Sequence, residues 1–233
     1  MGIINATPDS FVESSRYNMS VLAQPFDIVD VGACSTRPGA EPVGADEEWR
    51  RLEPVLREIA AMDSRPEISI DTYWSEVVRK AVDVVGPVMV NDVSAGEADP
   101  AMLPMVGRMG LKYVAMHHGA SFTGSSTPVS DAPILSQVGD FFEDFALKAE
   151  KFGIDWILDP GFGFGKNYAQ NWALLSGLSQ LKRFGRPVLV GVSRKIMTGG
   201  SAQVTLKAHR LAVRQGADIL RVHDYADVEN IIE

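Results

Sequence analysis

The chain has 233 residues, of which 45% are hydrophobic and 22% are charged, and its formal net charge is -8. This length and composition fit one domain, residues 1–233, with a single well-buried core. The negative charge argues against a general nucleic-acid or anionic-membrane surface, because both of those partners carry charge of the same sign.

Eight short runs rich in Val and Ile recur along the chain, and longer stretches separate them, as expected for the buried strands of a parallel sheet. In chain order the runs cover residues 2–5, 27–32, 67–71, 87–92, 111–117, 154–159, 187–192 and 218–222. Residues 46–62 and 74–85 have helical spacing, and Pro54 is expected to kink or relax the first of these helices. Eight repeats favour an α/β fold with a single (β/α)8 TIM barrel over an open doubly wound sheet.

Nearly every predicted strand ends in polar or charged residues, which strengthens the barrel prediction. These residues include Asn5, Asp71, Asn91, His117, Asp159, Lys195, Arg221 and His223. In a barrel the carboxyl ends of the strands meet on one face, and active sites are built there. The sequence therefore predicts one site to which these side chains contribute.

Asp71, Asn91 and Asp159 are the candidates for contact with a polar ligand, and each is weighed against a structural role. Asp71 stands just before a predicted helix and could serve only as its cap. Asn91 with Asp92 could serve only to form a turn. Asp159 is followed by Pro160 and a glycine loop, so capping explains it less well.

The loop DPGFGFGK, residues 159–166, is rich in glycine but matches neither a P-loop nor the dinucleotide-binding fingerprint. Its alternating glycines and phenylalanines predict a tight backbone that brings an aromatic face close to a flat ligand. The alternative is a plain turn with packed phenylalanines.

Four cationic or ionisable side chains follow predicted strands: Arg37, Lys195, Arg221 and His223. In a chain of net charge -8, cations gathered at one rim predict an anion site, since planar arginine side chains match phosphate oxygens. The loops after the last two strands are also where barrels commonly bind phosphate. The alternative is that each cation is simply solvated at the surface.

The segment after the first strand, residues 5–11, is too polar and turn-prone for a core, and its position suits a mobile lid that closes on a substrate. His117 and His118 could suggest a metal site. Adjacent residues on a strand point to opposite faces, however, so a shared metal is not expected. His117 could line the mouth of the barrel, and His118 has no assigned role.

Eight motifs in chain order resemble those of the dihydropteroate synthase family, and together they span nearly the whole chain. They are GIINATPDSF at 2–11, STRPGA at 35–40, IDT at 70–72, VND at 90–92, MH at 116–117, DPGFGFGK at 159–166, SRK at 193–195 and ILRVHD at 219–224. Any one of them would be a weak signal, but eight in order are highly specific. The resemblance implies a transferase in folate biosynthesis, in which 4-aminobenzoate displaces diphosphate from 6-hydroxymethyl-7,8-dihydropterin diphosphate and 7,8-dihydropteroate forms.

The resemblance also implies roles for individual residues. The implied pterin ligands are Asp71, Asn91, Met116, Asp159, Phe164, Lys195 and Arg221, of which Asp71, Asp159 and Lys195 are catalytic. The implied diphosphate ligands are Asn5, Arg37, Arg221 and His223, with Mg2+ as the cofactor bound by Asn5. The implied 4-aminobenzoate contacts are Thr36, Pro38, Phe164 and Ser193, and the implied mobile loop holds Thr7, Pro8, Asp9, Ser10 and Phe11. Diphosphate is expected to leave first, and the enzyme is expected to be a homodimer.

The chain departs from the family's pattern in three places. Residues 12–17 replace a usual Asp-Gly-Gly stretch, and the helix that follows is very short for a barrel. The connection around residues 197–203 is also short. Cys34 stands where the family usually has Glu.

Three other functions are compatible with parts of this sequence. A methyltetrahydrofolate methyltransferase barrel would share the pterin contacts but has no reason to keep Arg37, Arg221 and His223. A catalytically silent relative would bind pterin without turnover. A Schiff-base aldolase would use Lys195, but nothing in the sequence near that lysine indicates the desolvated pocket that such an amine needs.

We expect a cytoplasmic protein with small-molecule substrates and no nucleic-acid or membrane partner. Cys34 is the only cysteine in the sequence, which rules out an internal disulfide and a paired-cysteine metal site and makes a reducing compartment the default. No stretch reaches the roughly 18 apolar residues of a membrane span, and the first residues lack a targeting pattern.

Overall fold

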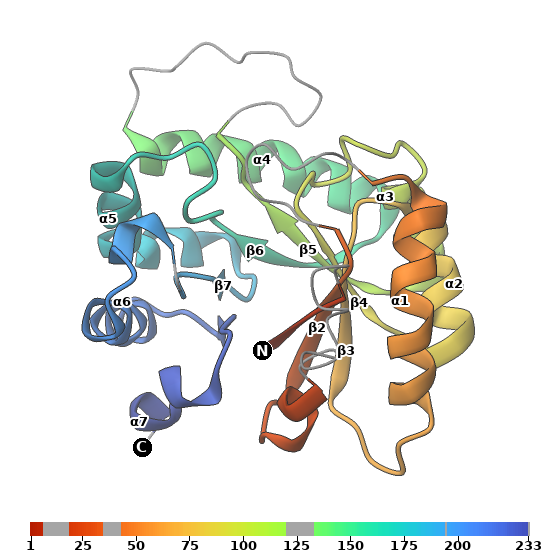
Figure 1. The fold of residues 1–233 in the computed structure, drawn as a ribbon. Coiled ribbons are helices and arrows are strands. Elements are labelled where there is room, and N and C mark those ends of the chain that lie inside the picture. Colours follow the sequence, from red (N-terminus) through yellow and green to blue (C-terminus); the bar gives the residue numbers. More distant parts are fainter. Residues whose placement is uncertain (7–18, 35–42, 120–132, 194, 233) are drawn as a thin grey trace.

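The computed structural model describes residues 1–6, 19–34, 43–119, 133–193 and 195–232, and all eight predicted strands are present in these ranges (Figure 1). They are β1 Gly2–Asn5, β2 Ile28–Gly32, β3 Glu67–Asp71, β4 Met89–Asp92, β5 Lys112–Met116, β6 Asp155–Asp159, β7 Leu189–Val190 and β8 Ile219–Leu220. The last two are shorter than the runs that predicted them, because only two residues of each form a regular ladder.

The strands form a ring of parallel neighbours. The first six pair in chain order, and β7 pairs with β8. Single parallel bridges, Leu158 to Val188 and Gly2 to Val222, join these two sheets at both edges. The amide of Val222 also donates to the carbonyl of Met1 at 3.0 Å, which supports the second join. The predicted (β/α)8 fold class is therefore confirmed.

Helices surround the strands (Figure 1). They are α1 Ala45–Ala60, α2 Ser75–Val85, α3 Met102–Met109, α4 Ile134–Phe152, α5 Tyr168–Ser176, α6 Ala202–Arg214 and α7 Glu229–Ile232, with 3-10 turns η2 Met19–Ala23, η3 Leu178–Phe184, η4 Ile196–Thr198 and η5 Tyr225–Asp227. Helix α1 continues through Pro54. Between β1 and β2 the described residues contain η2, and residues 7–18 of this connection lie outside the described ranges. None of the helices in the described ranges has the length and apolar character that a membrane crossing requires.

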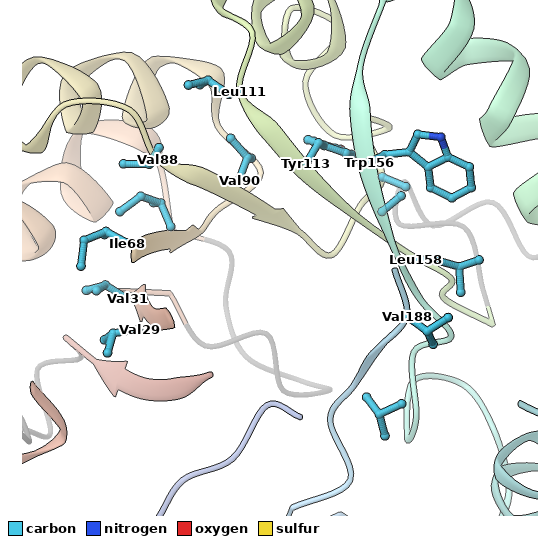
Figure 2. Packing of buried hydrophobic residues seen from close by; sticks show 14 of the residues in the cluster. Val29, Val31, Ile68, Val88, Val90, Leu111, Tyr113, Trp156, Leu158 and Val188 are labelled. Atoms are coloured by element: carbon cyan, nitrogen blue, oxygen red, sulfur yellow. The ribbon is translucent and has the colours of Figure 1, made fainter. Parts of the chain in front are cut away.

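Alternate residues of the strands belong to two different apolar clusters. Val29, Ile68 and Val90 point out of the ring and pack with residues of the helices, and Figure 2 shows them with other members of this outer cluster. A second cluster fills the inside of the ring with Met1, Met89, Val114, Ile157 and Leu189. Because side chains alternate along a strand, each next inward position lies two residues further on. These inward positions build the site.

Candidate active site

Side chains one step above the inner apolar cluster form a polar layer inside the barrel. Asn91 follows Met89 by two residues, and Asp159 follows Ile157 in the same way. Asp71 pairs in register with Asn91 on the neighbouring strand, so the two lie at the same level. The strand alternation that buries the core thus also aims these polar groups at one point, at the carboxyl ends of the strands.

A cavity lies at this level, and all seven predicted pterin ligands line it. Its walls are Asp71, Asn91, Val93, Met116, Asp159, Gly161, Phe162, Phe164, Gly191, Lys195 and Arg221. A wider hollow lies at the other end of β6, but two of its charged residues, Asp155 and Arg186, are exposed and pair with each other at 3.2 Å. The convergence of carboxylates and cations makes the first cavity the candidate site.

Asp71 is held by an arginine and does not cap a helix. Its Oδ2 accepts a hydrogen bond from Nη2 of Arg221 at 2.8 Å. The first turn of α2 is satisfied elsewhere, because the amide of Ser75 donates to Oδ2 of Asp99 at 2.8 Å. Burial raises the pKa of Asp71 to about 7, against the lowering effect of Arg221. The capping alternative for Asp71 is therefore wrong.

Asn91 and Asp92 separate into two roles. Asp92 forms the turn, since its carboxylate accepts from the amides of Ser94 at 2.7 Å and Gly96 at 3.0 Å and from the hydroxyl of Tyr113 at 2.7 Å. Asn91 instead faces into the barrel, where its Nδ2 donates to a buried carboxylate, and it lines the cavity. The turn-forming alternative holds for Asp92 and is wrong for Asn91.

The loop after β6 is held tightly around Asp159. The amide of Gly161 donates to Oδ1 of Asp159 at 2.8 Å. Nζ of Lys166 is buried and donates to the carbonyls of Gly161 at 2.7 Å, Phe164 at 3.1 Å and His117 at 3.3 Å. Burial lowers the pKa of Lys166 to about 7. Lys166 therefore fastens both ends of the Gly161–Phe164 turn to the end of β5.

The two phenylalanines of the loop differ. Phe162 is buried in the outer apolar cluster, although its edge also reaches the cavity wall. Phe164 packs beside Met116, and Nζ of Lys195 lies 4.4 Å from the centre of its ring. The packed-turn alternative thus describes Phe162, and the predicted aromatic face is Phe164.

Lys195 is desolvated, although the residues beside it in the sequence do not predict this. Burial lowers the pKa of its amine to about 8, although Asp159 and Asp71 act in the opposite direction. The sequence carried no sign of such a pocket because the groups around Lys195 come from strands far away in the chain. Lys195 thus has the desolvated amine that a Schiff-base aldolase would need, contrary to the expectation from the sequence.

His223 lies at the end of a short hydrogen-bonded chain. Its Nδ1 is 3.2 Å from Oγ of Ser193, and Oγ donates to Oδ2 of Asp227 at 3.0 Å. The single hydroxyl proton of Ser193 is therefore used by Asp227, so its oxygen accepts the Nδ1 proton of His223. In this geometry Ser193 has no side-chain proton to donate to a 4-aminobenzoate carboxylate.

The remaining predicted residues lie partly beyond the described ranges. Asn5 is exposed at the end of β1, and its register partner Gly32 pairs in turn with Asp71. The predicted residues outside the described ranges are Thr36, Arg37 and Pro38 and the whole predicted mobile loop, Thr7, Pro8, Asp9, Ser10 and Phe11. The structure thus assembles the predicted pterin ligands and leaves the rest of the anion and 4-aminobenzoate sites as predictions.

His117 and His118 both pack against an aromatic ring, and Nε2 of His118 also lies 3.7 Å from Oε2 of Glu97. Their rings lie 5.2 and 6.3 Å from the ring of Phe141 on α4, edge-on to it. The described residues that line the cavity do not include His117, so the expectation that it lines the mouth is not met. Both residues follow the last residue of β5, so strand alternation no longer applies to them. Burial lowers the pKa of His117 to about 3, which keeps the ring neutral.

Four residues around the site were missed from the sequence: Asp30, Glu48, Lys166 and Asp227. Asp30 lies inside an apolar run, and Lys166 ends the DPGFGFGK motif, but the sequence alone indicates no role for either. An acidic residue in the middle of the predicted strand 27–32 was the available signal, because ionisable residues are rarely fully buried without a partner. Nothing in the sequence singled out Glu48 or Asp227.

Comparison with known proteins points to one family. The family model for pterin binding enzymes matches residues 1–223. The dihydropteroate synthase of Escherichia coli (strain K12) is 36% identical over 250 positions, covering 96% of this chain and 86% of that protein. The dihydropteroate synthase of Mycobacterium leprae is 35% identical over 253 positions, covering 96% and 87%. Both alignments are longer than the 233-residue chain, so these relatives have residues that this chain lacks.

Solved structures agree with this. The Xanthomonas albilineans dihydropteroate synthase with 4-aminobenzoic acid superposes with a TM-score of 0.87 at 36% identity, covering 100% of this chain and 90% of that one. A structure of the Xanthomonas albilineans enzyme in complex with 7,8-dihydropteroate gives a TM-score of 0.83 at 35% identity, with the same two coverages.

Proposed function

This chain belongs to the dihydropteroate synthase family of pterin binding enzymes, and we propose on that premise that the cavity at its strand ends carries out the family's condensation. The protein is a transferase of folate biosynthesis. 4-Aminobenzoate replaces diphosphate on 6-hydroxymethyl-7,8-dihydropterin diphosphate, and 7,8-dihydropteroate forms. The observation that carries the proposal is the meeting of buried carboxylates with Lys195 and Arg221 around one cavity.

The pterin ring is bound by Asp159, Asn91 and Lys195. A pterin edge offers adjacent N–H donors, which a buried carboxylate such as Asp159 accepts as a pair, while Asn91 matches the neighbouring polar atoms. Lys195 donates to the carbonyl side of the ring. Met116 and Phe164 give the flat ring its apolar contacts.

Asp71 stabilises the positive charge that builds on the ring as diphosphate departs. The C–O bond breaks, and its electron pair leaves with the diphosphate oxygen. The amine nitrogen of 4-aminobenzoate then forms the new C–N bond with its lone pair and loses a proton. Arg221 already holds Asp71 in place at 2.8 Å, so little reorganisation is needed at the moment of reaction. No side-chain nucleophile is required.

The diphosphate is bound by Arg221, His223 and Arg37. A bidentate guanidinium matches phosphate oxygens, and an imidazole is easily protonated beside an anion. The hydrogen bonds from Ser193 to Asp227 and from His223 to Ser193 hold the imidazole in one orientation, with its Nδ1 proton directed at Ser193. These groups offset the charge that grows on the leaving group.

Mg2+ is proposed to accompany the diphosphate, with Asn5 as its protein ligand. The amide oxygen of an exposed asparagine at the end of β1 is a hard donor of the kind that Mg2+ takes, and this ion usually keeps waters and substrate phosphates as its other ligands. When bound, the ion would neutralise part of the diphosphate charge.

4-Aminobenzoate is proposed to be bound by Phe164, Thr36 and Pro38, with residues 7–11 as the mobile loop; of these, only Phe164 lies within the described ranges. Ser193 contributes to this subsite only if its hydroxyl turns away from Asp227, because the proton is otherwise used. The protein is further proposed to act in the cytoplasm and to form a homodimer. Light scattering of the purified protein tests the homodimer by its molar mass.

The first experiment follows diphosphate release. The purified protein is incubated with the pterin diphosphate, Mg2+ and 4-aminobenzoate, and it should release diphosphate and form 7,8-dihydropteroate. Asp159→Asn should abolish pterin binding and turnover. Asp155→Asn, the same change at the exposed start of the same strand, should leave both intact. Pterin binding by the wild type with no release would favour the catalytically silent relative.

A second variant tests the division of labour between ring and diphosphate. Arg221→Lys keeps a positive charge between the carboxylates but loses the planar fork. It should weaken binding of the pterin diphosphate more than binding of free pterin, as measured by calorimetry. Equal losses for the two ligands would contradict the assignment of Arg221 to the diphosphate.

A further inference from the structure

Asp30 is a fully buried carboxylate in the barrel interior, one step below the polar layer. It sits in the middle of β2, in register with Ile3 on β1 and Ser69 on β3. Apart from Ser69, this interior is filled by apolar side chains, among them Met89, Val114, Ile157 and Leu189. A buried carboxylate in such surroundings is costly unless its partners compensate for the lost water.

The partners of Asp30 are two residues of the site above it. Its Oδ2 accepts from Nδ2 of Asn91 at 2.9 Å and from Nε of Arg221 at 2.7 Å. Nη2 of Arg221 lies 2.7 Å from the same oxygen and 2.8 Å from Oδ2 of Asp71. The guanidinium is thus shared between a carboxylate of the cavity wall and one that lies beneath it.

Asp30 also decides which atom of Asn91 faces a ligand. Oδ2 of Asp30 already accepts from Arg221, so it acts as an acceptor toward Asn91 as well. The amide nitrogen must therefore point down, because the amide oxygen there would meet a carboxylate oxygen with no proton between them. Oδ1 of Asn91 is then the atom presented to the cavity that Asn91 lines.

Resting on the function proposed above, we propose that Asp30 is a positioning residue of this site, which fixes the amide of Asn91 with its oxygen toward the pterin and shares Arg221 with Asp71. Asp30 lines no part of the cavity wall, so it acts through these two residues. A ligand must then donate an N–H hydrogen bond to Oδ1 of Asn91. Asp71 is only partly neutralised by Arg221, because the guanidinium also pairs with Asp30.

The sharing of Arg221 has a consequence for the charge on Asp71. The groups that act on Asp71 are Arg221, Asp30 and Lys195 inside the barrel, Asp92 at the end of β4 and Glu48 from α1. Asp30 raises the pKa of Asp71 by its like charge and by competing for the guanidinium. Loss of the Asp30 charge should therefore let Asp71 ionise at lower pH.

Asp30→Asn tests the proposal, and Asp27→Asn, the same change at the exposed start of the same run, is the matched control. In Asp30→Asn the KM for the pterin diphosphate should rise about tenfold or more, since a hydrogen bond to a charged group is typically worth about 1.5–3 kcal/mol. The acidic limb of kcat/KM should move to lower pH. Asp27→Asn should change neither quantity.

A double-mutant cycle separates positioning from a general loss of structure. If Asp30 acts through Asn91, the losses in pterin binding of Asp30→Asn and Asn91→Ala should be far from additive. Asp30→Glu, which keeps the charge, should return the acidic limb toward the wild-type position, and it remains informative if Asp30→Asn fails to fold. An unmoved acidic limb together with additive losses would overturn the proposal.

Calorimetry with pterin alone keeps this test separate from the proposed reaction. If the wild type binds pterin but releases no diphosphate, the proposed function fails. Weaker pterin binding by Asp30→Asn than by Asp27→Asn would still support the positioning role of Asp30, and equal binding by both variants would count against it.

Discussion

Glu48 on α1 lies where burial disfavours the ionised form of its carboxyl group. Its side chain is fully buried, and among the described residues the hydrogen bonding of Thr72 offsets only part of the effect of burial. Burial raises its pKa to about 7, and the nearby Asp71 acts in the same direction. The folded protein therefore binds the carboxyl proton of Glu48 more tightly than the unfolded chain does, because the pKa in the unfolded chain is near 4.5.

The sign of this difference gives a prediction for stability. The contribution of Glu48 is greatest below pH 4.5 and is lost as the pH rises through 7. Glu48→Gln should accordingly be more stable than the wild type at pH 8, by up to about 3 kcal/mol, and nearly equal to it at pH 5. Urea unfolding at the two pH values measures this.

Glu53→Gln on the more exposed face of α1 serves as the control, because Glu53 is paired with Arg57 at the surface. It should not reproduce the pH-dependent gain. The same gain from Glu48→Gln at pH 5 and pH 8 would show that its cause is not the buried charge.

Two residues of the cavity predict a narrow pH range for activity. The pKa of Asp71 is raised to about 7 and that of Lys195 is lowered to about 8, in both cases chiefly by burial. Asp71 must be ionised and Lys195 protonated in the proposed reaction, so kcat/KM should rise as the pH passes 7 and fall above 8. Since these groups interact, the limbs report the pair as well as the single residues.

Lys195→Arg identifies the alkaline limb. A guanidinium stays protonated across the whole range, so this variant should lose activity but should no longer show the fall above pH 8. A pH profile of initial rates at low substrate concentration measures it. If the alkaline fall persists in Lys195→Arg, another group is responsible.

At the scale of one element, the turn after β6 depends on Gly161. Its φ is +68°, and a Cβ at this position would overlap the carbonyl oxygen of His117. Gly161→Ala should therefore displace the turn that Lys166 fastens, and with it the Asp159 carboxylate. We expect a loss of pterin binding, measured by calorimetry, and a lower melting temperature.

Gly153→Ala is a matched control for this prediction. Gly153 ends α4 with a φ of +65°, but nothing lies within 4 Å of a Cβ added there. This variant should show only the cost of a left-handed alanine, about 1 kcal/mol, and should bind pterin normally. Equal effects of the two variants would mean that backbone strain alone, without the overlap at His117, explains Gly161→Ala.

At the scale of the whole molecule, the ring of strands is held by fewer ladder hydrogen bonds at two places, between β6 and β7 and between β8 and β1. Strands β1 to β6 are linked by continuous ladders, whereas β7 and β8 pair over two residues and meet their other neighbours through single bridges. Regions with fewer ladder bonds open more readily. In hydrogen exchange, the amides of Leu189–Val190 and Ile219–Leu220 should lose protection before those of β5 and β6. Equal protection would show that the ring opens as one cooperative unit.

The sequence was sufficient for the order of the strands and for seven residues that line the cavity, for a physical reason. Apolar runs ended by Asp71, Asn91 or Asp159 carry both the buried strand and the polar group in a few consecutive residues. Contacts made across the barrel leave no such local pattern. The pairing of Arg221 with Asp30 joins residues 191 positions apart, and the desolvation of Lys195 also depends on distant strands.

The alternation of inward and outward side chains limits how this enzyme can change. Insertion or deletion of one residue within β4 or β6 would turn Asn91 or Asp159 from the cavity toward the helices and bring an apolar neighbour inward. Changes in the connections carry no such penalty, since the register inside each strand is untouched. Length variation among homologues should thus be confined to segments such as 6–27 and 197–203, while spacing inside the strands stays fixed to the residue.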